Sequence, residues 1–161
     1  MKILVDTSVW SLALRRRDSL GLSSEEQKLK AQLAQAVQDG RVVMIGLIRQ
    51  ELLSGIKEQA QFQKVQAALS PFLDETITTE DHEFAAQLYN ECRSQGVEAG
   101  TVDMLICAVA SRRGWEVLSS DSGLNRCFAL ARKYWAEART TDEANAPRSK
   151  RKPNAKASNK K

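Results

Sequence analysis

The chain has 161 residues, 42% of them apolar and 27% charged, which is typical of one globular domain that builds its own core. The longest apolar run, MLICAVA, is far too short to span a bilayer, and no signal-peptide pattern opens the chain, so we expect a cytoplasmic protein. The net charge of +4 is unevenly distributed: residues 148–161 hold seven Lys and Arg and no acid, whereas residues 1–147 hold 17 basic and 20 acidic side chains. Three cysteines form no CxxC pair and are expected to be reduced thiols.

Strand-like and helix-like patterns alternate through the first half of the chain. Residues 3–5 predict a short buried strand, 7–17 a helix and 41–46 a second strand. The stretch 23–40 predicts a helix, because Ser23 and Glu26 can form a capping box at its start and Gly40 can end it. Short helices are expected over 47–55 and 62–69, with Pro71 ending the latter.

The alternation continues in the second half. We expect a third strand over 75–79, helices over 80–96 and 101–114, a fourth strand over 115–120, a helix from 122, and a candidate last strand over 134–139. Alternating strands and helices predict an α/β fold, with a central, mainly parallel twisted sheet of four to five strands between two helical layers.

This domain is expected to cover residues 1–139. Residues 140–161 are expected to form a basic, disordered C-terminal tail, since so few of their side chains are apolar. The alternative is that the tail is an arm that binds a polyanion.

Four carboxylates stand at strand ends or at a helix start, and such a fold binds ligands outside the carboxyl ends of its strands. Asp6 directly follows the first strand, Glu51 follows the second within a helix, and Asp121 follows the fourth. Asp103 is the only charged residue in an apolar helix until Arg112. Because burying an unpaired carboxylate costs on the order of several kcal/mol, we expect Asp103 to have a partner.

Each acid also has a purely structural interpretation. Asp6 and Asp121 could cap the helices that follow them, and Glu51 could be an ordinary solvated side chain. Four acids gathered at one sheet edge would however repel one another unless a cation held them. Oxygen ligands without a His or Cys cluster fit Mg²⁺ or Mn²⁺, ions that promote phosphodiester hydrolysis. His82, the only histidine, is expected on a helix surface.

The segments ILVDTSVW, RQELLSG, GTVDMLICAVASRRG and VLSSDSGL are similar, in this order, to the four acidic motifs of the PIN-domain family. The resemblance covers about residues 2–130 and is in particular to VapC-type toxins of bacterial toxin–antitoxin systems. It implies a Mg²⁺- or Mn²⁺-dependent endoribonuclease. The metal-binding and catalytic residues that it implies are Asp6, Glu51, Asp103 and Asp121, and the supporting hydroxyl residues are Ser8 and Ser119.

The resemblance also implies partners. They are an RNA substrate such as transfer or ribosomal RNA, a small antitoxin that fills the active-site groove, and a second copy of the chain in a homodimer. Gly123 and Leu124 depart from the family pattern, which commonly has an acid and a Phe there, so the number of metal ions stays open. The tail, Arg15–Arg17 and Arg112–Arg113 are candidates for RNA contact, with surface salt bridges as the alternative.

Other classes of protein make different demands on the same positions. A phosphatase or phosphotransferase on a similar sheet would need an acid two residues after Asp6, where Ser8 stands. A binding module without catalysis would not need all four acids. A PIN nuclease that processes RNA outside a toxin–antitoxin system, or that cuts DNA, would carry the same residues.

Overall fold

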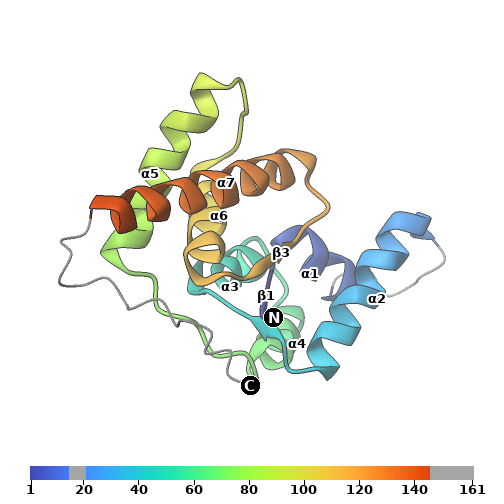
Figure 1. Cartoon of the computed structure of the whole chain (residues 1–161). Helices are drawn as coiled ribbons and strands as arrows, with labels where there is room; N and C mark the ends of the chain where they lie inside the picture. Colours follow the sequence, from blue (N-terminus) through green and yellow to red (C-terminus); the bar gives the residue numbers. More distant parts are fainter. Residues whose placement is uncertain (15–20, 146–161) are drawn as a thin grey trace, which may run out of the picture.

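The computed structural model describes residues 1–14 and 21–145, with side chains as far as Thr140. At its centre lies a parallel sheet of three strands, β1 (Ile3–Val5), β2 (Val42–Val43) and β3 (Glu116–Leu118), in the order β2-β1-β3 (Figure 1). Since β1 is the central strand, its residues Leu4 and Val5 are completely buried. Because all three strands run in the same direction, their carboxyl ends meet at one edge of the sheet.

Helices cover the sheet on both sides, as the α/β prediction requires. Helices α5, α6 and α7 pack against one another, and α1 and α2 pack together on the other side of β1 (Figure 1). The helices described are α1 (Thr7–Leu14), α2 (Ser24–Gln38), α3 (Gly46–Leu53), α4 (Gln59–Leu69), α5 (Thr79–Ser94), α6 (Thr101–Arg113) and α7 (Ser122–Asn145).

Local sequence signals explain the ends of the helices that flank the site. The predicted capping box at α2 is present, with Ser23 N donating to Glu26 Oε2 at 2.8 Å and Glu26 N donating to Ser23 Oγ at 3.2 Å. Helix α6 ends at Gly114, whose φ of 66° is a left-handed conformation that glycine adopts without strain. Between its ends, α6 is buried from Met104 to Ser111, so it is the central helix of the core.

Within residues 1–14 and 21–145, the sheet has three strands rather than the predicted four to five. The stretch predicted as a strand over 75–79 forms none; only an isolated bridge joins Asp74 to Met44 beside β2. Side chains take the place of a strand partner there, because Arg113 Nη2 donates to the Thr76 carbonyl at 2.8 Å and Thr78 N donates to Asp81 Oδ2 at 2.9 Å.

The candidate last strand over 134–139 is also wrong, because these residues belong to α7. No Gly or Pro interrupts the chain between Leu124 and Asn145, so nothing ends the helix there. Tyr134 and Trp135 pack on Phe84 of α5, with ring centroids 6.0 and 5.0 Å apart, which anchors this part of α7. The expected tail boundary at residue 140 therefore lies within a helix, and residues 146–161 lie outside the described residues.

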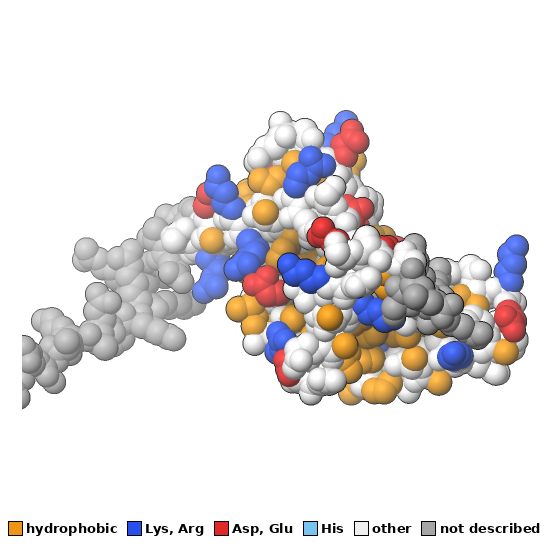
Figure 2. Space-filling view, turned by 90° about the vertical axis from the view of Figure 1, so that its right-hand side faces the viewer, with side chains coloured by type: hydrophobic (Ala, Val, Ile, Leu, Met, Phe, Trp, Pro, Cys, Tyr) orange, Lys and Arg blue, Asp and Glu red, His pale blue; other side chains and the backbone are white. Residues whose placement is uncertain are grey.

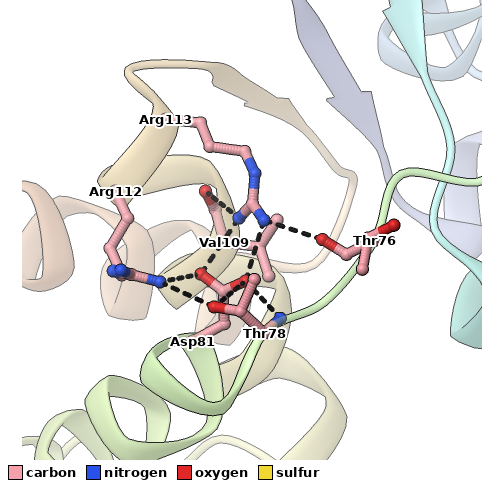
Figure 3. Close-up of polar contacts among 6 residues, drawn as sticks. All are labelled: Thr76, Thr78, Asp81, Val109, Arg112 and Arg113. Carbon is pink, nitrogen blue, oxygen red and sulfur yellow. Dashed lines mark hydrogen bonds and ion pairs between the residues drawn. The ribbon is translucent and has the colours of Figure 1, made fainter.

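One buried carboxylate ties α5 to α6 (Figure 3). The side chain of Asp81 is fully buried and forms ion pairs with Arg112 and Arg113 at the end of α6. Asp81 also accepts a hydrogen bond from the Thr78 backbone and so caps its own helix. These bonds occupy Arg112 and Arg113, so the structure favours the salt-bridge alternative for these two residues over the predicted RNA contact.

The remaining surface and core features are ordinary. Basic and acidic side chains are interspersed over the face in Figure 2, and apolar side chains gather in its lower part. In the described part of the chain, no helix combines the length and hydropathy needed to cross a membrane. The three cysteines are buried and unpaired.

Candidate active site

All four predicted acids line one cavity of about 540 Å³ at the carboxyl edge of the sheet. Asp6 follows β1, Asp121 follows β3, Glu51 lies in α3 and Asp103 lies in the first turn of α6. These residues are up to 115 positions apart in the chain, and the parallel sheet brings the elements that carry them together. The structure therefore places all four acids at one cavity, and their metal-binding and catalytic roles stay predictions.

Asp6 is the most enclosed of the four, with only 5% of the residue exposed. Its Oδ2 atom accepts hydrogen bonds from the Ser8 hydroxyl at 2.6 Å and the Ser119 hydroxyl at 2.9 Å. Its Oδ1 atom accepts a hydrogen bond from the Thr7 hydroxyl at 3.2 Å. Asp6 also caps α1, since Ser8 N donates to Oδ2, so this residue caps a helix and lines the cavity at the same time.

Ser8 and Ser119 connect the two loops that carry Asp6 and Asp121. The Ser119 hydroxyl accepts a hydrogen bond from Asp121 N at 2.9 Å while donating to Asp6. The Ser8 hydroxyl accepts from Ser120 N at 3.2 Å while donating to Asp6. Both predicted hydroxyl residues thus hold the position of Asp6 relative to Asp121.

Asp103 and Asp121 each use one carboxylate oxygen to cap a helix. Asp103 Oδ2 accepts a hydrogen bond from Gly100 N at 2.9 Å at the start of α6, and Asp121 Oδ1 accepts one from Leu124 N at 2.9 Å at the start of α7. These bonds fix the direction of each side chain. The second oxygen of each carboxylate makes no hydrogen bond within the described residues, and so it is available to a ligand.

Burial and the neighbouring carboxylates raise the pKa values of Asp103 and Glu51. Burial raises the pKa of Asp103, the hydrogen bond from Gly100 opposes this, and the charges of Asp6 and Asp121 raise it further. Burial also raises the pKa of Glu51; the charges of Asp6 and Asp103 add to the increase, and a hydrogen bond with Thr7 opposes it. A positive charge in the cavity would relieve this repulsion.

The donor set suits a hard cation, since four carboxylates and several hydroxyl groups surround the cavity. The carboxylates do not, however, converge on a single point. Among the described residues, no three His, Cys, Asp or Glu side chains are arranged to hold a metal ion as they stand. An ion bound here would accordingly need water molecules among its ligands, which is common for Mg²⁺.

Four further polar residues line the cavity and were not predicted from the sequence: Thr7, Ser11, Gln50 and Ser54. The sequence signal that could have identified these residues is their helical spacing. Ser11 lies four residues after Thr7 and Ser54 lies four residues after Gln50, so each pair shares a helix face. His82 is exposed on α5, as predicted, and lines a different cavity.

The fold and the site together define a class of protein. Its members are α/β domains in which acids gather at the carboxyl edge of a parallel sheet. The sequence model of the PIN domain matches residues 3–128, a range that contains all four acids and both supporting serines. The chain therefore belongs to the PIN-domain family, whose members are typically nucleases and generally depend on divalent metal ions.

A solved structure has the same fold. The crystal structure of FitAcB from Neisseria gonorrhoeae superimposes with a TM-score of 0.60 at 20% sequence identity, covering 80% of this chain and 92% of the other. At this identity the similarity concerns the fold. The search of curated proteins found no match for this chain.

Proposed function

We propose that this chain is a Mg²⁺- or Mn²⁺-dependent endoribonuclease, and that it is the toxin of a toxin–antitoxin pair. The observation that carries the proposal is the single cavity lined by Asp6, Glu51, Asp103 and Asp121. A PIN fold with all four acids at one cavity favours hydrolysis of a phosphodiester bond over the alternative of a binding module that has lost catalysis.

The chain's own residues prepare the site. Ser8 and Ser119 orient Asp6, and helix caps orient Asp103 and Asp121, so three carboxylates are held in place before any ligand binds. Glu51 also lines the cavity, and its side chain is exposed to solvent. Asp6, Glu51, Asp103 and Asp121 would hold a divalent ion, which would supply positive charge to lower the pKa of a water molecule and to stabilise the leaving oxygen.

The proposed partners are an RNA substrate, such as transfer or ribosomal RNA, a cognate antitoxin and a second copy of the chain, all in the cytoplasm. Support for a protein partner comes from a second, mostly apolar cavity of about 550 Å³ beside the acidic one. Thr101 and Val102 line it, and they directly precede Asp103. A partner bound there would lie next to the acids. The similarity of the fold to FitAcB is in keeping with this proposal.

The test is cleavage of end-labelled RNA by the purified protein. We expect cleavage with Mg²⁺ or Mn²⁺ and none with EDTA, and we expect Asp6→Asn and Asp103→Asn each to reduce the rate by at least about a thousandfold, since each removes an anionic ligand. Glu58→Gln, a change of an exposed carboxylate outside the cavity, is the matched control and should be fully active.

Two outcomes would overturn the proposal. The first is full activity in EDTA or in both Asn variants. The second is cleavage of DNA in preference to RNA, which would make the protein a DNA nuclease with the same site. Growth arrest on expression, relieved by Asp6→Asn, tests the toxin part separately.

A further inference from the structure

We infer that the exposed face of α7 binds the phosphate backbone of the RNA and leads it away from the acidic cavity. The inference rests on the proposed function, since it concerns how the same substrate is held. The two basic side chains of this surface, Arg126 and Lys133, lie outside the four acidic motifs.

The first step is the position of α7. The helix starts at the cavity, because Asp121 lines the cavity and accepts the hydrogen bond from Leu124 N that caps the first turn. From this point α7 extends as a single helix to Asn145. An RNA strand bound along the exposed face of α7 would therefore enter the acidic cavity at the position of Asp121.

The second step is which side chains α7 exposes. Ser122, Arg126, Ala129 and Lys133 are all exposed, and their spacing of three to four residues places them along one face. The opposite face holds the buried residues Leu124, Cys127, Phe128 and Ala131. The two basic side chains on the exposed face are separated by about 10 Å along the helix axis, at about 1.5 Å per residue.

The third step is charge. Between Ser122 and Thr140, α7 carries four basic side chains and one acidic side chain: Arg126, Arg132, Lys133, Arg139 and Glu137. Arg132 forms an ion pair with Glu116 at 3.1 Å. Arg126, Lys133 and Arg139 form no ion pair within the described residues. Asp142 and Glu143 follow in the last turn, so the basic surface is confined to residues 126–139.

Cations elsewhere on the domain are less available to RNA. Arg49, Arg112 and Arg113 are bound to Asp74 or Asp81. Helix α2 has two lysines in its first half but also two glutamates, and α5 has more acidic than basic side chains. Between Ser122 and Thr140, α7 carries three cations without an ion-pair partner among the described residues, more than any other described helix, and such cations are what a phosphate backbone binds.

The experiment measures binding of a fluorescein-labelled single-stranded RNA at several KCl concentrations, in EDTA so that no cleavage occurs. We compare wild type with R126A/K133A and with K28A/K30A, a control that removes the same charge from α2. R126A/K133A should bind about five- to tenfold more weakly at low salt, with a salt slope reduced by about 0.7 for each phosphate that is no longer neutralised. The control and the conservative variant R126K/K133R should bind as wild type does.

Cleavage assays with Mg²⁺ separate this inference from the proposed function. R126A/K133A should raise KM and leave kcat within about twofold of wild type, because the changed residues are outside the acidic cavity. If wild type cleaves RNA and R126A/K133A binds and cleaves it equally well, the inference about α7 is wrong. If wild type binds RNA through α7 but cleaves none under any metal condition, the nuclease proposal fails and the binding surface stands.

Discussion

The Ser119 hydroxyl links the end of β1 to the end of β3 through hydrogen bonds to Asp6 and Asp121. The hydroxyl is buried, donates to Asp6 and accepts from the backbone of Asp121, so one small side chain sets the spacing of two candidate ligands. Gly123 leaves room for the Asp121 carboxylate in the same region, because it has no side chain. A Cβ atom there would lie 3.0 Å from Asp121 Oδ1, which is closer than most Cβ contacts in proteins. Gly123 stands where the family commonly has an acid, and here a side chain at this position would press on the Asp121 carboxylate.

We predict that Ser119→Ala lowers the rate of RNA cleavage about 10- to 100-fold and raises the Mg²⁺ concentration needed for half-maximal activity, because the partners of metal ligands typically have effects of this size. The melting temperature should change by only a few degrees. Ser120→Ala is the matched control, since Ser120 contributes its backbone N–H to this network. Equal activity and equal Mg²⁺ dependence in the two variants would show that Ser119 does not position Asp6.

At the scale of the elements, the contact between α5 and α6 depends on one ionised carboxylate. Burial alone would raise the pKa of Asp81, but hydrogen bonds from Arg113, the Thr78 backbone and Arg112 outweigh it and lower the pKa from 3.8 to about 2. The folded state therefore favours the charged form of Asp81. This preference for the charged form stabilises the folded protein fully at pH values above the unfolded-state pKa near 4. The stabilisation is lost as the pH falls toward 2. A shift of this size corresponds to roughly 2 kcal/mol.

We accordingly predict that Asp81→Asn lowers the free energy of unfolding at pH 7 by about 2–4 kcal/mol, because it leaves Arg112 and Arg113 without their buried partner. Urea unfolding of wild type and variant between pH 7 and pH 2 checks this. The difference between the two proteins should be constant down to about pH 4 and then shrink. A difference that stays the same to pH 2 would mean that Asp81 does not titrate in this range.

At the scale of the whole molecule, acidic and basic side chains are unevenly distributed along the chain. Residues 1–147 have an excess of acids, and the seven Lys and Arg of residues 148–161 supply the positive net charge. Together with the basic face of α7, the tail is thus the main candidate for electrostatic attraction of RNA. The tail itself lies outside the described residues.

Deletion of residues 148–161 is predicted to weaken RNA binding at low salt and to flatten its dependence on KCl concentration, because fewer counterions are released from the RNA. Cleavage at saturating RNA should change little, since the deletion leaves the cavity intact. The same binding assay, performed on the truncated and the full-length chain, measures the effect. Identical salt slopes would show that the tail takes no part in binding.

Much of this protein was determined by short-range sequence signals. The alternation of strands and helices, the capping box at Ser23, the glycine stop after α6 and the acids after apolar strands all reflect interactions within a few residues, so the sequence indicated them directly. The same signals failed over 75–79 and 134–139. A strand requires a partner in space, and there the available partners were the Arg113 side chain and the aromatic ring of Phe84.

What only the tertiary structure decided is how the acids share one cavity. The sequence left Asp6 and Asp121 as either helix caps or site residues, and in the structure each carboxylate both accepts a backbone hydrogen bond at its helix start and lines the acidic cavity. The bridge from Ser119 to Asp6 joins residues 113 positions apart, and no local pattern specifies such a contact. It exists because β3 pairs with β1 in parallel and so brings their carboxyl ends together.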